Sequence, residues 1–274
     1  MALTQLQRGI MISIAKNRSD SSYMAGGVVL NMDWPRLSDD LDIFHDTDEE
    51  IGETAQRDMD TLKLDGFRVS VEVNIYGCVE ARVSRFGEST LIQWMSETRM
   101  RFFPLIRDEE WGARLHPLDL AINKVIAASA RRKARDYVDL LSIEENLASL
   151  GPLIMAAAGK PPHFSPVRTI EEIRRKALSV TDDEYLSVRG IPENWTPSFV
   201  RQKISDVLER AEDYVRSAPS DVVGLLATNA DGSAAAFGNR NLEGVTLRRA
   251  TVEPEVMPEF PEVRPTWKTH PDSD

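Results

Sequence analysis

The fold is decided by a stretch that begins with Ala25-Gly26-Gly27-Val28 and continues, after seven residues, with Arg36-Leu37-Ser38-Asp39-Asp40-Leu41-Asp42-Ile43-Phe44. The run from Leu41 to Phe44 is typical of a short strand. Asp40 and Asp42 lie two positions apart at its start, so their side chains project from the same face. Two carboxylates on one face repel each other unless a cation relieves the repulsion, and Mg²⁺ favours a few carboxylate oxygens combined with phosphate oxygens. The pattern predicts a metal site at the start of this strand.

The glycine pair upstream fits a phosphate-bearing ligand. Gly26 and Gly27 have no Cβ, so their backbone can approach a phosphate closely. Ser38 adds a hydroxyl between the glycines and the aspartates. Two simpler interpretations stay open, because a glycine pair is often only a turn. In addition, the segment from Asp39 to Glu50 carries seven acids and no lysine or arginine, as solvated loops do.

A third carboxylate is expected from a later strand. Between Val69 and Ile75, apolar and polar residues alternate with period two, which is typical of a half-buried strand. Glu72 lies on its polar face and would join Asp40 and Asp42 if the two strands were neighbours. Three such carboxylates can hold two cations roughly 3.5–4 Å apart, an arrangement suited to displacement at phosphorus. Alternatively, Glu72 is a cross-strand partner of Arg82.

A second informative block begins at Pro117, which suits the first position of a helix. Its apolar residues recur at helical spacing and surround Lys124 with small, apolar neighbours. After Lys124 the block continues with Arg131 and then with Arg135-Asp136-Tyr137-Val138-Asp139-Leu140. Taken alone, these charges are more typical of ion pairs between residues four apart on a helix, each worth a few tenths of a kcal/mol.

Together, these motifs resemble the nucleotidyltransferase (DNA polymerase β-like) superfamily. The string Arg36-x-Ser38-x-Asp40-Leu41-Asp42, followed by the helical block, is most similar to the AbiEii-type branch, the toxin half of type IV toxin–antitoxin systems. The resemblance spans roughly Ala25 to Leu141. It implies an α/β fold, with a nucleotidyltransferase-like mixed sheet and flanking helices. A mainly helical C-terminal region with a small β element follows.

The resemblance also implies a set of site residues. Asp40 and Asp42 would ligate Mg²⁺, and Glu72 would complete the metal and catalytic site. Gly26, Gly27 and Ser38 would lie against the triphosphate of an NTP co-substrate, Lys124 would neutralise its charge, and Asp136 would belong to the catalytic rim. The family usually has Ser or Thr where this chain has Val28, so the hydroxyl at that position is missing.

Composition narrows the function classes. The chain has 274 residues, 42% of them hydrophobic, and a net charge of −11, which disfavours a protein whose whole surface binds nucleic acid. A local exception is the basic stretch Lys124–Arg135, with five positive charges and no acid, which predicts either an RNA acceptor surface or a solvated helix junction. A single cysteine, no secretion pattern and no apolar run long enough for a membrane span predict a cytoplasmic protein.

The remaining patterns predict three regions: a catalytic domain over 1–115, a mainly helical domain over 116–252, and a poorly ordered tail over 253–274 with five prolines and six acids. Helices are expected over 3–14, 53–64, 165–179 and 198–217. Further strands are expected over 79–86, 89–94, 102–106, 222–226 and 245–252. Met24 to Leu30 is expected to be a strand or strand-turn.

The leading hypothesis is Mg²⁺-dependent transfer of a nucleoside monophosphate from an NTP to an acceptor hydroxyl. The resemblance suggests RNA, such as a tRNA 3′ end, as the acceptor and an antitoxin protein as a partner. One alternative is nucleotidylation of a small cationic molecule, as in aminoglycoside-modifying relatives, which would suit the acidic charge. Another is a catalytically inactive binding protein with the same fold, which the substitution at Val28 would favour.

Overall fold

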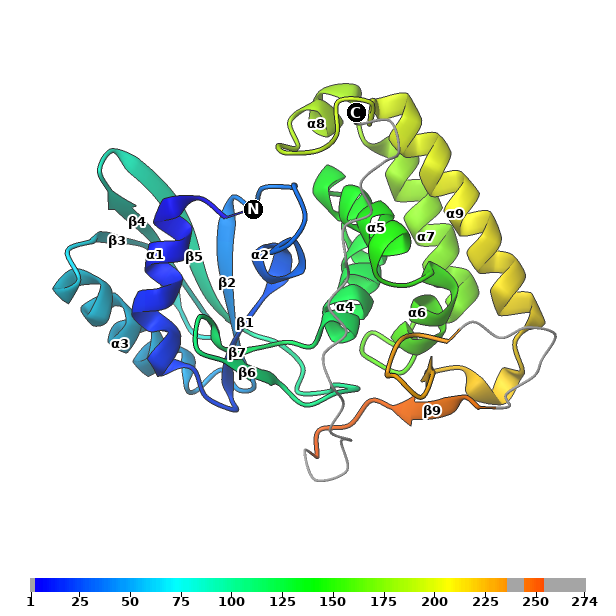
Figure 1. Ribbon diagram of the computed structural model, residues 1–274, viewed down its shortest axis with the longest axis horizontal. Helices are drawn as coiled ribbons and strands as arrows, with labels where there is room; N and C mark the ends of the chain where they lie inside the picture. Colours follow the sequence, from blue (N-terminus) through cyan, green and yellow to red (C-terminus); the bar gives the residue numbers. More distant parts are fainter. Residues whose placement is uncertain (1–2, 236–243, 254–274) are drawn as a thin grey trace. The chain divides into compact units, whose positions relative to one another are not determined.

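The computed structural model describes residues 3–235 and 244–253. The chain divides into two compact units (Figure 1). The first comprises Met1–Arg99 and Leu105–His116; the second comprises Met100–Pro104 and Pro117–Asp274. The expected boundary between residues 115 and 116 lies next to the change of unit at His116. The assignment of Met100–Pro104 to the second unit was not predicted.

A mixed sheet forms the centre of the first unit. Among the described residues it contains seven strands in the order β3-β4-β5-β2-β1-β7-β6. The strands are β1 Ser22–Ala25, β2 Asp40–His45, β3 Arg68–Ile75, β4 Cys78–Arg85, β5 Glu88–Ser96, β6 Ile106–Asp108 and β7 Gly112–Arg114. The β2–β5 and β1–β7 pairs are parallel and the other pairs are antiparallel. The expected mixed α/β sheet is therefore confirmed.

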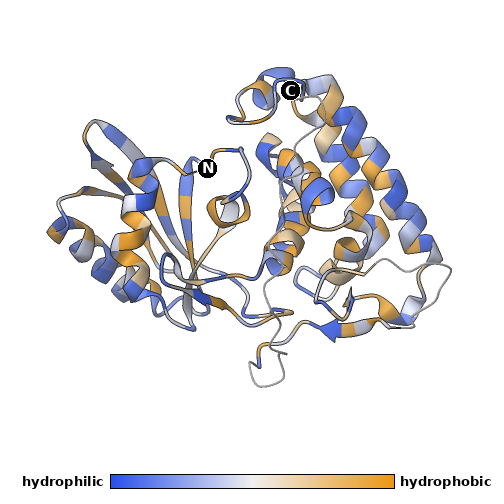
Figure 2. Cartoon of the chain, viewed as in Figure 1, coloured by the Kyte–Doolittle hydropathy of each residue, from blue (hydrophilic) through white to orange (hydrophobic). Residues whose placement is uncertain are grey.

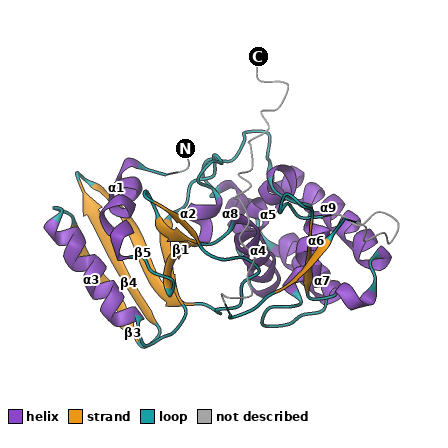
Figure 3. Ribbon diagram, turned by 60° about the horizontal axis from the view of Figure 1, so that its bottom comes forward, coloured by secondary structure: helices purple, strands orange, loops and turns teal. Residues whose placement is uncertain are grey.

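Two helices cover one face of this sheet, α1 (Gln5–Ile14) and α3 (Ile51–Leu64) (Figure 3). Thr4 begins α1 with a capping box, in which its side chain and that of Gln7 each accept a backbone N–H. Leu41, Ile43, Ile92 and Trp94 are fully buried beneath these helices. Alternate residues of β2 and β5 therefore fill the core, and those between them face the other side of the sheet.

Charged groups are also buried beneath these helices. The Arg18 guanidinium forms a fully buried ion pair with Asp58 of α3. Asp58 also accepts hydrogen bonds from Asn17 and, at 2.8 Å, from the indole N–H of Trp94. His45 at the end of β2 is fully buried beside this pair. The network ties α3 to the sheet through polar contacts that are shielded from water.

The second unit is mainly helical, as expected. Its helices are α4 Pro117–Ala130, α5 Ala134–Asn146, α6 Leu150–Ala157, α7 Pro166–Ser179, α8 Asp182–Leu186 and α9 Pro197–Ser217. Ser165 and Thr196 cap α7 and α9 with their hydroxyls, and each helix has a proline in its first turn. The apolar face of α9 is buried, and most of its other positions are polar (Figure 2). A small antiparallel pair, β8 Leu225–Thr228 and β9 Thr246–Arg249, supplies the expected β element.

The strand expected over 102–106 is wrong, since only Ile106 lies in a strand. Phe102 and Phe103 are buried in the second unit. Their backbone N–H groups donate to the carboxylate of Asp119 at 3.0 Å each, instead of to a neighbouring strand. One carboxylate therefore satisfies the backbone of this buried apolar pair.

Other differences concern glycines and prolines. The segment expected as strand or strand-turn changes at Gly26 into a short helix, α2 (Gly26–Leu30). Gly151 and Pro152 lie in the first turn of α6, where a proline lacks no needed hydrogen bond. Residues 254–274 of the expected tail lie outside the described residues. Within the described ranges, no helix has both the length and the apolar character of a membrane span.

Candidate active site

The two aspartates lie on the face of β2 that α1 and α3 do not cover. Leu41 and Ile43 point into the core beneath α1 and α3, so Asp40 and Asp42 face the opposite side of the sheet. Asp40 is 9% exposed, and its carboxylate accepts a hydrogen bond from the Ser38 hydroxyl at 3.2 Å. The structure thus places both carboxylates side by side on one face, with Ser38 orienting the first.

Gly26 is packed directly against Asp42. Ala25, the last residue of β1, pairs with Asp42, and the backbone then turns at Gly26 with a φ of +69°. A Cβ added at Gly26 would lie 1.7 Å from Oδ2 of Asp42. Both the positive φ and the closeness of this carboxylate therefore require glycine.

Gly27 lies against two further polar groups. A Cβ at this position would be 2.5 Å from Nη2 of Arg36 and 3.0 Å from the Ser38 hydroxyl. Arg36 is 2% exposed, and its Nη1 donates to the Leu37 carbonyl. The glycine pair is consequently surrounded by a carboxylate, a guanidinium and a hydroxyl. Arg36 belongs to the motif that resembles the AbiEii-type branch, but the sequence analysis assigned it no role. Its fixed spacing from Ser38 and Asp40 in that motif is the feature that could have identified it as a site residue.

Glu72 does not join this group. Its strand, β3, lies at the edge of the sheet, separated from β2 by β4 and β5. Its carboxylate accepts hydrogen bonds from Arg82 at 2.5 and 3.1 Å. The condition for its role as a metal ligand and catalytic residue, that the two strands be neighbours, is therefore not met. The alternative, a cross-strand ion pair with Arg82, is the arrangement found.

Gln93 occupies the place beside Asp42 that was expected for Glu72. It is the residue of β5 paired with Asp42, and its other neighbour, on β4, is Glu80. The Gln93 carboxamide donates its N–H to the Glu80 carboxylate at 2.5 Å. This bond fixes the amide, so its carbonyl oxygen is directed away from Glu80 and remains an acceptor. The sequence pattern placed Gln93 in a strand but did not reveal which strand lies beside it.

The donor set suits Mg²⁺. Asp40 and Asp42 offer carboxylate oxygens and Gln93 a neutral oxygen, all hard ligands. In the part of the chain that the structure describes, no group of three or more His, Cys, Asp or Glu side chains could hold a metal. A cation here would therefore depend on substrate phosphates to complete its ligand shell, as Mg²⁺ commonly does.

Val28 belongs to the core and not to the site. It is 1% exposed within α2, so the residue that replaces the family hydroxyl is an apolar packing residue. The hydroxyl nearest to the glycine pair is instead that of Ser38, which touches the position of a Gly27 Cβ. Ser38 thus supplies a hydroxyl beside the glycine pair, where Val28 does not.

Lys124 and Asp136 lie in the second unit, in a buried ionic cluster. The ammonium of Lys124 is 2.7 Å from Asp139 and 3.5 Å from Asp136. Arg131 donates to both oxygens of Asp136, at 2.7 and 3.0 Å. Burial raises the pKa of Asp136, but the bonds from Arg131 and the charges of Lys124, Arg131 and Arg135 outweigh it and lower the pKa. Asp136 therefore stays ionised and holds the two cations in place.

The basic stretch from Lys124 to Arg135 is largely neutralised within its unit. Besides the pairs of Lys124 and Arg131, Arg132 binds Glu184 at 2.8 Å and the Ser179 carbonyl. The pair between Arg131 and Asp136 joins residues five apart, and the one between Arg132 and Glu184 joins the α4–α5 connection to α8, so neither is a pair between residues four apart. Lys124, Arg131 and Arg132 thus have carboxylate partners, and the stretch offers less free charge than its sequence suggests.

Comparison with known proteins gives similarity in structure but not in sequence. No protein-family model matches the chain, and no curated protein is significantly similar to it. A similar solved structure is MenT4, a nucleotidyltransferase toxin from Mycobacterium tuberculosis H37Rv, with a TM-score of 0.52 and 15% identity over 76% of this chain and 85% of that one. JHP933 from Helicobacter pylori follows with a TM-score of 0.44 and 14% identity over 78% of this chain and 93% of that one. At such identities the likeness concerns the fold, and the chain has the nucleotidyltransferase fold.

Proposed function

We propose that this protein is a Mg²⁺-dependent nucleotidyltransferase that moves a nucleoside monophosphate from an NTP to an acceptor hydroxyl. The observation that carries the proposal is the packing of Asp42 onto Gly26 within a nucleotidyltransferase fold. A backbone that admits no side chain next to a metal-binding carboxylate is what close approach of a polyphosphate requires. Asp40, Ser38 and Arg36 complete the surroundings of that point.

Each group has a distinct task in this reaction. Asp40 and Asp42 would hold the cation, which supplies positive charge to the phosphates and to the departing pyrophosphate. Ser38 orients Asp40 and presents its hydroxyl near Gly27. The Arg36 guanidinium, buried against Gly27, adds a fixed positive charge that a phosphate can share. Positioning and charge stabilisation would supply most of the catalysis.

The transfer is a single displacement at phosphorus. The acceptor oxygen forms a bond to the α-phosphorus, and the bond from that phosphorus to the oxygen bridging to the β-phosphate breaks. Pyrophosphate leaves with the bonding electron pair. The proton of the acceptor hydroxyl passes to a carboxylate of the site and from there to water.

For Lys124 we propose the role that the family resemblance implies, neutralisation of the triphosphate, with Asp136 as its positioning partner. In its unit the ammonium is held by Asp139 and Asp136. Binding a triphosphate would exchange part of this pairing for phosphate oxygens, so the carboxylates hold the ammonium in position until the nucleotide arrives. Lys124→Ala should then raise the KM for NTP more than it lowers kcat.

As the acceptor we propose an RNA 3′ hydroxyl, such as that of a tRNA, and as the biological role a cytoplasmic toxin restrained by an antitoxin protein. The support is the resemblance of the motif set to the AbiEii-type branch and the structural likeness to a nucleotidyltransferase toxin. The basic stretch contributes less support than expected, because ion pairs within the unit occupy most of it.

The direct test is labelling of a total tRNA pool with each α-³²P-NTP in the presence of Mg²⁺. Wild type should label RNA, and Asp42→Asn, which keeps the shape of the side chain but removes its charge, should not. Glu72→Gln is the matched control, because it neutralises a carboxylate on the same sheet that lies away from the site. Labelling of neither RNA nor small cationic acceptors with any NTP would refute the proposal, and equal labelling by Asp42→Asn would refute the site.

A further inference from the structure

The turn between β4 and β5 has an unusual sequence for its geometry. Phe86 and Gly87 form its centre with φ angles of +53° and +84°, and Arg85 pairs with Glu88 across it. Two consecutive positive φ angles define the two-residue turn that favours Asn-Gly or Gly-Gly. A bulky aromatic residue is a genuine outlier in this conformation.

Packing does not compensate for this strain, because Phe86 is 92% exposed. An aromatic side chain normally gains stability by burial, and this one gains almost none. A residue that opposes both the local conformational preference and the usual burial is most simply explained by a task performed in contact with something else.

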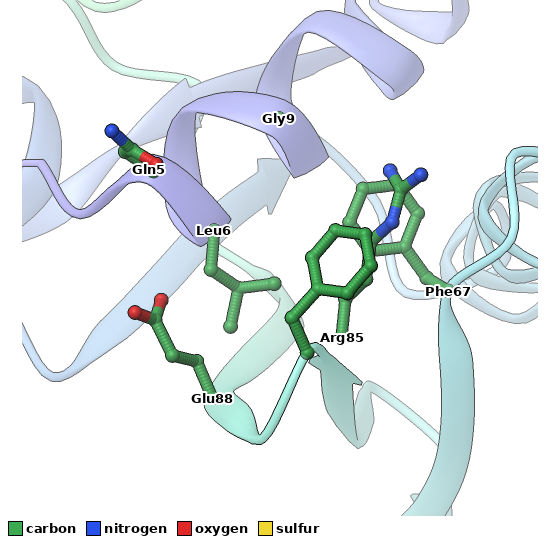
Figure 4. A pocket seen from close by; sticks show the side chains of 7 residues that line it. Gln5, Leu6, Gly9, Phe67, Arg85 and Glu88 are labelled. Atoms are coloured by element: carbon green, nitrogen blue, oxygen red, sulfur yellow. The ribbon is translucent and has the colours of Figure 1, made fainter.

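Phe86 ends a short column of stacked groups. The guanidinium carbon of Arg85 lies 4.9 Å from the ring centroid of Phe86 and 4.9 Å from that of Phe67, both within cation–π distance. Phe67, which directly precedes β3, is buried and anchors the column (Figure 4). The column is therefore fixed at one end and presents an open aromatic face at the other.

Beside the column lies a hollow of about 240 Å³. Leu6 and Gly9 of α1 contribute an apolar wall, and Gln5 and Glu88 bring a carboxamide and a carboxylate to its lining (Figure 4). Pockets for drug-sized molecules measure about 300–1,000 Å³. A hollow of this size takes one planar ring system, with polar groups available for its edge.

We propose that this hollow is a stacking site for a nucleobase. Stacking on an aromatic ring, a nearby arginine and hydrogen-bonding groups at the edge are how proteins hold unpaired bases. A helix or strand of a partner protein would need a much larger surface, since stable interfaces bury about 1,200 Å² or more.

Sheet register relates the site to the proposed reaction, on which this inference rests. β5 starts at Glu88 and runs parallel to β2, with Leu91 beside Asp40. The turn between β4 and β5 therefore lies beyond the edge of the sheet at which β2 begins. Glu88, where β5 starts, is three residues before Leu91, which corresponds to about 10 Å along the strand. The hollow is on the α1 side of that edge and the aspartates are on the other. An RNA whose 3′ hydroxyl lies at Asp40 and Asp42 would pass over the edge and place an upstream base on Phe86.

The test is Phe86→Asn, which has two opposite expected effects. It creates the favoured Asn-Gly turn, so the melting temperature should rise. It also removes the stacking face, so binding of a fluorescein-labelled single-stranded oligoribonucleotide, followed by anisotropy, should weaken at least about fivefold. Unchanged binding, or a loss of binding accompanied by a lower melting temperature, would overturn the proposal.

Controls separate stacking from other contacts. Phe86→Tyr should bind as wild type, whereas Phe86→Leu, which keeps an apolar side chain, should bind as weakly as Phe86→Asn. Tyr76→Asn is the matched control: Tyr76 also precedes a glycine at a hairpin turn and is 75% exposed, but it donates to Glu49 and has no positive φ. Equal loss of binding in Tyr76→Asn, or full binding by Phe86→Leu, would contradict a stacking site.

Two further experiments identify the molecule that supplies the base and distinguish the stacking site from the proposed transfer reaction. Competition by mononucleotides as strong as that by the oligoribonucleotide would assign the hollow to a free nucleotide; weak competition would assign it to a strand. Asp42→Asn should bind the oligoribonucleotide normally while losing transfer. Phe86→Asn should retain binding of Mg²⁺–NTP. A protein that binds the strand through Phe86 but transfers nothing would retain this site and refute only the proposed reaction.

Discussion

Replacing Gly26 by alanine is the sharpest test of the proposed site. The added Cβ would lie 1.7 Å from Oδ2 of Asp42, whereas real Cβ atoms essentially never come within 3.0 Å of a neighbour. Either the carboxylate or the backbone must therefore move by more than 1 Å. The positive φ at this position adds a conformational cost of about 1–2 kcal/mol.

These two effects separate activity from stability. A misplacement of about 1 Å in a catalytic group costs on the order of 100-fold in rate. Gly26→Ala should therefore reduce kcat/KM for nucleotidyl transfer by about 100-fold or more, while lowering the free energy of unfolding by only about 1–3 kcal/mol. The measurements are transfer of label from α-³²P-NTP, and thermal and urea denaturation. Mn²⁺ titration followed by electron paramagnetic resonance should show weakened metal binding.

Two other glycines provide graded controls. At Gly27 the added Cβ would meet the ends of the Arg36 and Ser38 side chains, which can shift, so a smaller loss of activity is expected. At Gly52, in the first turn of α3, a Cβ would meet nothing within 4 Å, so Gly52→Ala should leave activity unchanged and add up to about 1 kcal/mol of stability. A folded Gly26→Ala protein with near wild-type transfer would refute the reasoning that Asp42 acts from this position.

Three more predictions follow from the described contacts. Gln93→Leu should weaken Mn²⁺ binding, measured with a non-hydrolysable NTP analogue, by about tenfold. Glu80→Ala should weaken it less, because Glu80 acts only through the orientation of Gln93. No change in either variant would exclude Gln93 as a ligand. Asp119→Ala should lower the free energy of unfolding in urea by about 3 kcal/mol, because it removes the acceptor of two buried N–H groups and the charge partner of Lys160. Adding Lys160→Met should restore part of that loss, and strict additivity would contradict the coupling. Burial, reinforced by the charge of Arg18, lowers the pKa of His45 from 6.5 to about 4. As the pH falls, the unfolded state therefore binds the proton before the folded state does. The free energy of unfolding should fall by about 3 kcal/mol as the pH drops from 6.5 to 4. His45→Gln should flatten this part of the pH profile, and an unchanged profile would show that His45 is not the titrating group.

The alternation within a strand predicted which side chains share a face of the sheet, but it did not predict which strands are neighbours. Alternation placed Asp40 and Asp42 on one side of a strand, and the structure has them there. Alternation was a poorer guide in the strand of Glu72, because a register shift between Val71 and Val73 interrupts it, and Val71 and Ile75 are exposed. What no pattern within a strand can specify is the order of strands in the sheet. With β5 beside β2, Glu72 lies at the far edge and Gln93 lies beside Asp42.

A second wrong prediction arose where a side chain, instead of a neighbouring strand, accepts hydrogen bonds from the backbone. Phe102 and Phe103 were expected in a strand. In the structure the carboxylate of Asp119 accepts their N–H groups, and it lies more than a dozen residues away in the chain. A carboxylate that replaces a strand partner leaves no periodic pattern. By contrast, the capped helices α7 and α9 followed from local spacing, because both their caps and their apolar faces are encoded locally.

The charges of the protein lead to a last prediction about how it would hold RNA. With a net charge of −11, and with Lys124, Arg131 and Arg132 bound to carboxylates, electrostatic attraction offers little affinity. A stacking site with one arginine, Arg85, does not need strong electrostatic attraction to bind a base. The slope of log K against log salt for a single strand is about −0.7 per neutralised phosphate, so binding at the hollow should give a slope of about −0.7. Engagement of all five cations of the basic stretch would give about −3.5 instead. A steep slope that is unaffected by Phe86→Asn would assign RNA binding to the basic stretch and show that its ion pairs open for the acceptor.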